Sequence, residues 1–442
     1  MEREPLPFSR WWLVVVGALA MGLAGTYQFV WSSLSGPLGT QIGASGTALG
    51  TVFTVFVVFQ TASQFPAGWV RDRYGPRYPL LAGAVLLAAG YLGTATAGSV
   101  ATVYLAYGVG GVGAGVAYTV ALNTPVKWFD ERRGLATGVV GTAYGGASFL
   151  LIPAVRRGLD AAFVPTLYAL AVLSGLALLL AAAVLRDPPG MAIGGGRDGP
   201  ADGEVGDGPT ENEPADGSVD EPTDGPADGP TDSAAAGAPA SAPDPDPDAH
   251  RAYTWRETIR TWQFWLLYAV FVVVNGVGLM LIGKAVAYAG QFGLAPAVAT
   301  ASASVIAISD AGGVLGGGWL SDRIGPIRTI AGSLVLCGIA LGASIVAGAG
   351  GIGVAFVVLV GAAAFFRSPI FVVLPGLVGT YYGRSRSSGN YALLYSSKLW
   401  GGVFGGTVSS GLVVALGWSE TFAVGAALLV AAGLATTLVR PV

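Results

Sequence analysis

The chain has 442 residues, of which 53% are hydrophobic and only 11% are charged. Soluble domains carry about 25% charged residues, so this composition excludes a water-soluble globular protein and predicts that a lipid bilayer covers most of the surface. One histidine, His250, and one cysteine, Cys337, are too few for a metal site, a disulfide or a catalytic triad. We therefore expect no enzyme, no metal and no cofactor.

Twelve apolar segments follow one another, each near the roughly 20 residues that cross about 30 Å of hydrocarbon. They are predicted at residues 11–33, 46–68, 78–97, 100–122, 134–154, 163–185, 262–284, 297–320, 329–347, 352–376, 391–413 and 420–439. No small-residue cleavage site follows the first of them, so we expect it to be retained as a helix. The 69 Gly residues favour closely packed membrane helices, with codon bias as the alternative explanation. The predicted fold class is an all-α polytopic membrane protein.

A segment rich in Asp, Gly, Pro, Ala and Thr interrupts the apolar pattern in mid-chain. Sixteen of the 26 acidic residues fall between Asp187 and His250, against one basic residue, Arg197. Such a segment cannot bury a core and is expected to be disordered. It divides the chain into a six-helix bundle at 1–186, an acidic cytoplasmic linker at 187–255 and a second six-helix bundle at 256–442. The linker is either a solvated spacer or a regulatory, partner-binding loop.

The distribution of Lys and Arg predicts the orientation in the membrane. Eighteen of the 23 basic residues fall in segments that face inward if the amino terminus is cytoplasmic. Only Arg156, Arg157 and Lys284 are assigned to outer loops. Because basic residues gather on the cytoplasmic side of membrane proteins, both termini and the linker are expected there.

A repeated motif links the two halves of the chain. Residues 68–77, Gly-Trp-Val-Arg-Asp-Arg-Tyr-Gly-Pro-Arg, are echoed by residues 318–326, Gly-Trp-Leu-Ser-Asp-Arg-Ile-Gly-Pro. The register is even, because Trp12 precedes Asp72, and Trp262 precedes Asp322, by 60 residues. Parallel repeats of this kind place a substrate site between the halves, near the middle of the membrane.

This Gly-x-x-x-Asp-Arg-x-Gly-Pro turn resembles the signature of the major facilitator superfamily. The resemblance implies that family's fold of two pseudo-symmetric six-helix bundles. Asp72 and Arg73, with Asp322 and Arg323, are predicted gating residues, whose charges pair with neighbouring helix ends and separate when the halves rock. The alternative is that they only anchor the loops at the inner face.

Four stretches are similar to the oxalate/formate antiporter family and, more distantly, to the monocarboxylate transporters. They are Phe-Val-Val-Phe-Gln at 56–60 running into Pro-Ala-Gly at 66–68, then Val-Lys-Trp-Phe-Asp-Glu-Arg-Arg-Gly-Leu-Ala-Thr-Gly at 126–138, then Gln-Phe-Trp-Leu-Leu-Tyr at 263–268, and Tyr-Ala-Leu-Leu-Tyr-Ser-Ser-Lys at 391–398. The second and fourth stretches are the specific part of this resemblance. It covers both halves of the chain but not the linker.

Three ionisable residues lie well inside the predicted spans, namely Asp310, Arg367 and Lys398. Each costs at least about 2.5 to 3.5 kcal/mol at the centre of a membrane helix, so each is a candidate site residue. If all three are ionised, the net charge is +1, which suits a monoanion. The alternative is a structural ion-pair network that joins the predicted spans at 297–320, 352–376 and 391–413.

The resemblance implies a role for two of these residues. In the antiporter family a lysine of helix 11 and an arginine of helix 8 grip the two carboxylates of oxalate, and Lys398 matches the lysine. The arginine is missing, because Val314 occupies its position, so Arg367 is the predicted second cation. Asp310 falls where the monocarboxylate transporters are implied to carry a proton-coupling aspartate.

Several polar and aromatic residues could wall such a site or donate hydrogen bonds to an anion. The predicted binding residues besides Lys398 and Arg367 are Tyr395, Tyr27, Gln28, Tyr118, Tyr144 and Asn275, with Trp31 as a further wall residue. For each tyrosine, packing or a place in the interfacial aromatic belt is the alternative.

The sequence has no phosphate-binding Gly-Lys-Ser/Thr loop, so ATP is not expected to drive this protein. We predict a secondary active transporter of a small organic anion, an oxalate- or formate-like carboxylate, moved by exchange or with a proton on Asp310. The alternatives are a proton-coupled symporter of a monocarboxylate such as lactate or pyruvate, and a membrane sensor that binds its anion without transport. The expected partners are the anion, the bilayer and protons, with no nucleic acid. The protein is expected to be a monomer in the plasma membrane.

Overall fold

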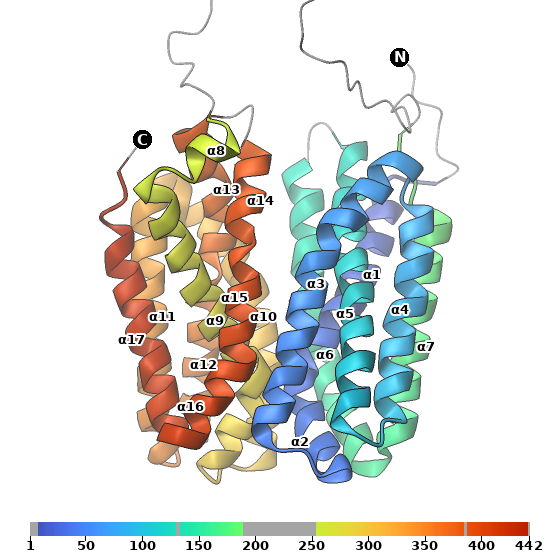
Figure 1. Ribbon diagram of the computed structural model, residues 1–442, viewed down its shortest axis with the longest axis vertical. Coiled ribbons are helices and arrows are strands. Elements are labelled where there is room, and N and C mark those ends of the chain that lie inside the picture. The colour runs from blue at the N-terminus through green and yellow to red at the C-terminus, as the bar shows by residue number, and fades with distance from the viewer. Residues whose placement is uncertain (1–7, 130–132, 189–252, 384–386, 441–442) are drawn as a thin grey trace, which may run out of the picture. The chain divides into compact units, whose positions relative to one another are not determined.

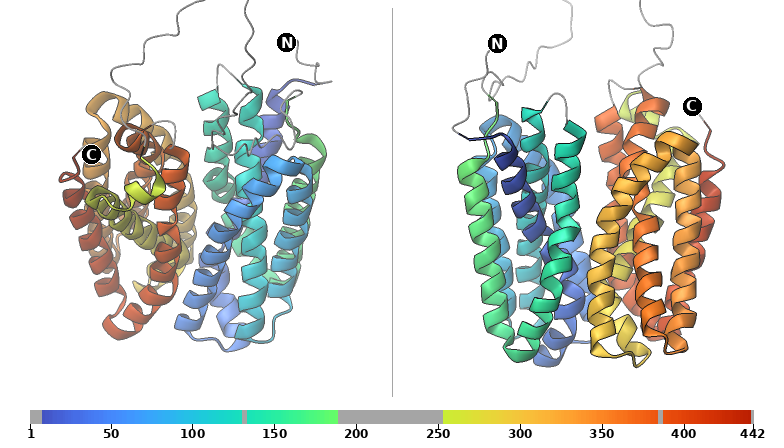
Figure 2. Two further views of the ribbon diagram at one scale, coloured as in Figure 1. Left: turned by 45° about the horizontal axis from the view of Figure 1, so that its top comes forward. Right: turned by 180° about the vertical axis from the view of Figure 1, so that it is seen from behind.

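The computed structural model describes residues 8–129, 133–188, 253–383 and 387–440. Within these residues it is helical, and 12 of its helices are long and apolar enough to cross a membrane. Figures 1 and 2 show the helices in two groups, one from each half of the chain. The predicted all-α, twelve-span fold class is confirmed. Most of the predicted linker, including His250, lies outside the described residues, so the domain boundaries stay a prediction.

The first half supplies the blue to green helices of Figure 1. They are α1 (Trp11–Phe29), α2 (Trp31–Ile42), α3 (Gly46–Tyr74), α4 (Arg77–Ala95), α5 (Val100–Asn123), the short 3₁₀ helix η1 (Pro125–Trp128), α6 (Arg133–Ala161) and α7 (Phe163–Val184). Side chains cap the start of two of these helices. Ser45 accepts a hydrogen bond from the Ala48 N–H at the start of α3, and Ser99 accepts one from the Thr102 N–H at the start of α5. Gly75 ends α3 with φ of 79°, a conformation that favours glycine.

The second half supplies the yellow to red helices. They are α8 (Trp255–Thr258), α9 (Trp262–Gln291), α10 (Pro296–Ile324), α11 (Pro326–Ala349), α12 (Gly353–Arg367), α13 (Pro369–Tyr382), α14 (Ser387–Tyr395), α15 (Ser397–Val403), the π-helical turn η3 (Phe404–Val408), α16 (Ser409–Leu416) and α17 (Trp418–Thr436). Two spans are interrupted. One breaks at Ser368, just before a proline that cannot donate a helical hydrogen bond, and the other breaks at Ser396.

The helices extend further than the hydropathy pattern predicted. Arg156 and Arg157 lie inside α6, and Lys284 lies inside α9, so their assignment to loops was wrong. The apolar residues that follow Lys284 continue the helix to Gln291. A hydropathy window stops at the first charge, whereas a long basic side chain remains in a helix if its charged end reaches a polar environment.

Small residues allow the two halves to meet closely. Helix α6 packs against α10, and α3 packs against α15, η3 and α16. A Cβ atom on Gly145 would collide with the backbone oxygen of Ala307, and one on Gly402 would lie 2.7 Å from Val57 Cγ1. Small side chains are typical of membrane helices whose backbones approach one another.

Contacts between the halves also form a polar seam towards one face of the molecule. We call the face where α1 begins and α17 ends the terminal face, and the other the opposite face (Figure 1). The Thr54 hydroxyl donates to the Gly402 carbonyl oxygen at 3.0 Å and lies 3.0 Å from the Thr407 hydroxyl. Because Thr54 is in the first half of α3, which starts at the opposite face, this seam lies on that side.

Candidate functional site

A central cavity of about 160 Å³ lies between the two halves and is lined by residues of both. It brings together most of the residues that the sequence predicted for a binding site. The predicted residues at its wall are Lys398, Arg367, Tyr395, Gln28, Tyr118, Tyr144, Asn275 and Asp310. Val314, the position that corresponds to the missing arginine, lines the same cavity.

Lys398 reaches this cavity from α15, one residue after the helix begins. Its side chain is buried, and its ammonium donates a hydrogen bond to Gln60 Oε1 of α3 at 3.1 Å. The Tyr395 ring lies on the other side of the helix break, with its centroid 5.8 Å from the ammonium. Among the described residues, no carboxylate forms an ion pair with Lys398. A buried cation with only neutral partners is left at the cavity wall.

Gln60 connects this lysine to the first half of the chain. Its amide nitrogen donates to the Tyr144 hydroxyl at 2.8 Å, and that hydroxyl donates to Gln28 Oε1 at 3.0 Å. Each side chain therefore holds the next in one orientation. The sequence did not predict Gln60 as a site residue, although it is a polar amide within an apolar span and ends one of the four resembling stretches.

Arg367 and Asp310 form the second charged group of the cavity. The Arg367 guanidinium pairs with Asp310 Oδ1, and the Ser368 hydroxyl donates to the same oxygen. The guanidinium also lies over the Phe371 ring, 5.1 Å from its centroid. At the break after α12, the Ser368 hydroxyl lies within hydrogen-bonding distance of both Asp310 Oδ1 of α10 and the Ala364 carbonyl oxygen of α12. The aspartate therefore offsets the charge of Arg367, but not that of Lys398.

Two more of the predicted residues, one amide and one aromatic, have structural partners. Asn275 lines the cavity, and its amide donates to the Phe271 carbonyl oxygen at 2.8 Å. Tyr27 does not line the cavity, because its fully buried ring stacks on Tyr107 with centroids 4.4 Å apart. A role for Tyr27 in binding stays a prediction. Trp31 lines a different cavity.

The predicted gating residues are arranged differently in the two halves. In the first half, Arg71 is 1% exposed and pairs with Asp72 and Asp187, each at 2.7 Å. Lys127 lies 3.7 Å from both carboxylates. These residues join the end of α3 to η1 and to the segment after α7. Arg71, which the sequence analysis overlooked because it sits at a span end, is the centre of this network.

The other gating residues make simpler contacts. Arg73 lies over the Trp69 and Tyr74 rings, and Arg323 lies 3.8 Å from the centroid of the Trp319 ring. In the register of the repeat, Ser321 stands where the first half has Arg71. Within the described residues, no ion pair joins these motifs across the halves. The gating role of the four charges stays a prediction.

Replacing Arg71 with glutamine is expected to lower the stability of the protein markedly. Removing one partner of a buried ion pair costs about 3 to 5 kcal/mol when the remaining charge is left uncompensated. Asp187 is only 12% exposed but keeps Lys127 at 3.7 Å, so we expect a loss towards the lower end of that range. Thermal unfolding of the detergent-purified protein would measure the loss as a lower midpoint. Arg73→Gln is the matched control, since Arg73 is exposed and should change the midpoint little. Equal midpoints for both variants would contradict the structural role of Arg71.

Twelve membrane helices in two halves around a buried polar cavity are the architecture of a multi-pass membrane transporter. The chain belongs to the Major Facilitator Superfamily, whose sequence profile matches residues 14–315 and 271–442. The predicted membership is confirmed.

Comparison with individual proteins supports the finer resemblance. The chain is 27% identical to the oxalate:formate antiporter of Oxalobacter formigenes over 419 residues, which cover 94% of this chain and 87% of that protein. It is 25% identical to the uncharacterized transporter YhjX of Escherichia coli over 394 residues, 87% of this chain and 84% of the relative. It is 29% identical to monocarboxylate transporter 11 of Homo sapiens over 153 residues, which cover 34% of this chain and 32% of that protein. The resemblance to the antiporter and, more distantly, to monocarboxylate transporters is confirmed.

A solved structure shares the fold. The nucleoside transporter NupG superposes with a TM-score of 0.67, covering 97% of this chain and 98% of its own, at 12% identity. At that identity the likeness concerns the fold alone.

Proposed function

We propose that the protein is a secondary active transporter that moves a small carboxylate by alternating access. The observation that carries the proposal is the buried ammonium of Lys398, which faces the central cavity with no acidic partner among the described residues. An unpaired cation inside a membrane protein is costly and usually marks a substrate or ion pathway. An anionic solute supplies the missing partner.

The charges of the cavity favour a monoanion. Asp310 offsets Arg367, so Lys398 is left as the net charge of +1. A dianion in a poorly hydrated cavity is better matched by two free cations, and Val314 stands where the second is expected from the resemblance. A carboxylate that draws the Lys398 ammonium towards itself would weaken its hydrogen bond to Gln60, which is a contact between the halves.

Binding would then be linked to the movement of the halves. Lys398 belongs to the second half, and its partner Gln60 belongs to the first. A solute that takes the ammonium away from Gln60 favours the state in which that cross-half hydrogen bond is absent, because a ligand shifts an equilibrium by its differential affinity for the two states. This is the step that alternating access requires.

The names of two relatives support a carboxylate as cargo. The oxalate:formate antiporter and the monocarboxylate transporter 11 are both named for carboxylates, and the first matches nearly the whole chain. The gating role of Asp72, Arg73, Asp322 and Arg323 belongs to this proposal, as do the plasma membrane location, the cytoplasmic termini and the monomeric state.

A proton-coupled symporter of a monocarboxylate is the second candidate function. It is favoured by Asp310, a carboxylate at the cavity wall whose pairing with Arg367 would be released by protonation. The sensor hypothesis depends on residues 189–252, which lie outside the described part of the chain.

Counterflow into proteoliposomes tests the proposed function. Vesicles loaded with one unlabelled carboxylate would be offered radiolabelled formate, oxalate, acetate, lactate or pyruvate, with acetamide as the uncharged control. We expect uptake of at least one monocarboxylate, driven by the trapped anion, and none of acetamide. Empty vesicles of the same lipid give the background. Uptake of no carboxylate, or equal uptake of acetamide and acetate, would contradict the proposal.

A further inference from the structure

A second cavity, of about 400 Å³, shares α6 and α9 with the central one and lies towards the opposite face. On α9, Ile282 lines the central cavity, while the next two residues, Gly283 and Lys284, line the second. On the first span, Gln28 lines the central cavity and Trp31 the second. The two cavities are therefore stacked along one path through the protein.

The polar seam between the halves separates the two cavities. Going along α3 from the opposite face, Gly50 lines the second cavity and Thr54 forms the seam, and Gln60 then holds the lysine of the central cavity. Along α15, η3 and α16, read from the opposite face, Ser410, Thr407 and Lys398 follow in the same order. The seam residues therefore lie, along both elements, between the residues that line the two cavities.

Lys284 brings a positive charge to the second cavity. It lies inside the membrane span of α9, and its ammonium donates a hydrogen bond of 2.7 Å to the Ser410 hydroxyl. No carboxylate pairs with it within the described residues. The same cost argument that singles out Lys398 therefore applies to Lys284, and the central site does not use it.

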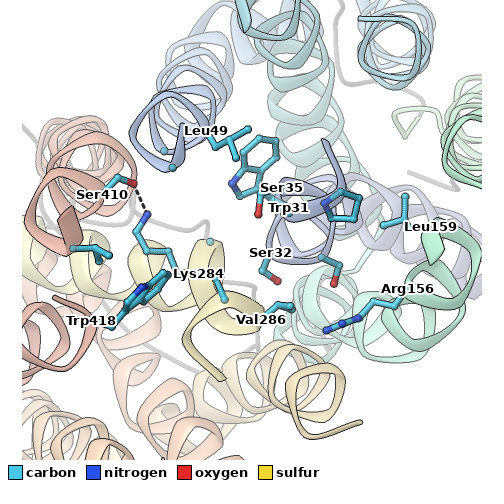
Figure 3. Close-up of a pocket in the computed structure, with 18 of the residues that line it drawn as sticks. Trp31, Ser32, Ser35, Leu49, Arg156, Leu159, Lys284, Val286, Ser410 and Trp418 are labelled. Carbon is cyan, nitrogen blue, oxygen red and sulfur yellow. Dashed lines mark hydrogen bonds between the residues drawn. The ribbon is translucent and has the colours of Figure 1, made fainter. Parts of the chain in front are cut away.

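Arg156 brings a second positive charge from α6. Figure 3 shows Arg156 and Lys284 reaching the cavity from two separate sides, with Ser32 and Val286 between them. Asp160 interacts electrostatically with Arg156, but the Nη1 atom of Arg156 is buried without a hydrogen-bond partner, and so is the Ser33 hydroxyl, which also lines the cavity. Buried polar groups of this kind cost free energy unless a ligand or water satisfies them.

The rest of the wall sets the chemistry of the ligand. Asp160 also lines the cavity, so the two cations and this acid leave a net charge of +1. The wall also carries Trp31, Leu159, Val286 and Trp418. One anionic group with an apolar body matches this combination, because the cations accept the charge and the aromatic and aliphatic wall covers the body.

We propose that the second cavity is a separate anion site, at which a monocarboxylate with an apolar body binds from the opposite face. That the anion binds here before the seam opens towards the central cavity rests on the proposed function. Binding to the second cavity does not depend on it. Lys284 and Arg156 are its cationic residues, and Ser33 is its hydrogen-bonding residue.

Equilibrium dialysis of the full-length detergent-purified protein with radiolabelled benzoate tests the proposal. The first variant is Lys398→Gln, which disables the central cation, and it should still bind benzoate. Adding Lys284→Gln should weaken that remaining binding by about tenfold or more, the loss expected for one charge-assisted contact, and Lys284→Arg in its place should largely retain it. Arg157→Gln is the matched control, because Arg157 is exposed and does not line the cavity.

Each outcome decides the question. No benzoate binding by the Lys398→Gln variant, or binding unchanged by the added Lys284→Gln, would overturn the second site. So would equal binding of benzoate and its uncharged analogue benzamide. Wild-type and Lys398→Gln proteins that bind alike, with binding lost in Lys284→Gln, would support the second site and count against the central one. Thermal unfolding of each variant confirms that the loss is not a folding defect.

Discussion

Replacing Lys398 with glutamine is expected to abolish carboxylate uptake at low substrate concentration while leaving the protein folded. The ammonium is buried, faces the central cavity and is held by a neutral amide. A hydrogen bond to a charged group contributes about 1.5 to 3 kcal/mol, so its loss weakens anion binding about 10- to 150-fold at 1.4 kcal/mol per factor of ten. Glutamine keeps a polar group near Gln60 and avoids an empty space.

The measurement is counterflow of the transported carboxylate into proteoliposomes at a concentration below the wild-type half-saturation. Ser397→Ala is the matched control, because Ser397 is the buried neighbour of Lys398 but does not line the cavity. That variant should transport like the wild type. If Lys398→Gln also transported like the wild type, Lys398 would be removed from the site and the cargo class would lose its basis.

Replacing Asp310 with asparagine is expected to shift the anion preference and to abolish any proton coupling. The change frees Arg367 and raises the net charge of the cavity from +1 to +2. Binding of oxalate, a dianion, should therefore strengthen relative to binding of formate. Asparagine cannot exchange a proton, so uptake driven by an imposed pH gradient should be lost even where exchange persists. Competition between labelled formate and unlabelled oxalate, with and without the gradient, measures both effects.

A stability control and one further variant separate charge from folding. Removing one partner of a buried pair destabilises a protein by about 3 to 5 kcal/mol, so Asp310→Asn needs a thermal unfolding control. Ser368→Ala removes a hydrogen bond to the same Asp310 oxygen without changing any charge, and it should alter neither the preference nor the pH dependence. An unchanged preference in folded Asp310→Asn would show that the aspartate does not set the charge of the cavity. Uptake in that variant that still rises with the pH gradient would exclude Asp310 as the proton-coupling group.

The fold was predictable because its main signals are strong in the sequence. Apolar segments of membrane-spanning length and a repeat with an even register fix twelve helices in two halves. The charged residues of the central cavity were also predictable, since an ionisable residue in the middle of a span is rare and costly. The spacing within one helix then places Asp310 and Val314 on a common face, and both line the cavity.

Partners across the halves were not predictable, because they depend on how the bundles dock. Nothing in the sequence says that Gln60 rather than another polar residue meets Lys398, or that Tyr27 packs on Tyr107 instead of facing the cavity. The breaks at Ser368 and Ser396 were missed for a related reason. Hydropathy measures the apolar length of a span and is unaffected by a local interruption of its hydrogen bonds.

The charges near the helix ends were also harder to interpret. Arg71 and Lys284 lie where a span passes into a loop on the hydropathy scale, and there a basic residue usually anchors the helix in the interface. Only the packed structure shows that Arg71 is buried among carboxylates and that Lys284 faces a cavity. The second anion site therefore emerged from the structure and not from the sequence.

A structure of the protein with a bound monocarboxylate would show directly whether the Lys398 ammonium holds the anion in the central cavity. We predict that the carboxylate oxygens lie in the central cavity, within hydrogen-bonding distance of the Lys398 ammonium. The hydrogen bond between Lys398 and Gln60 should then be absent. A central cavity that stays empty at a saturating carboxylate concentration, with Lys398 still bonded to Gln60, would contradict it.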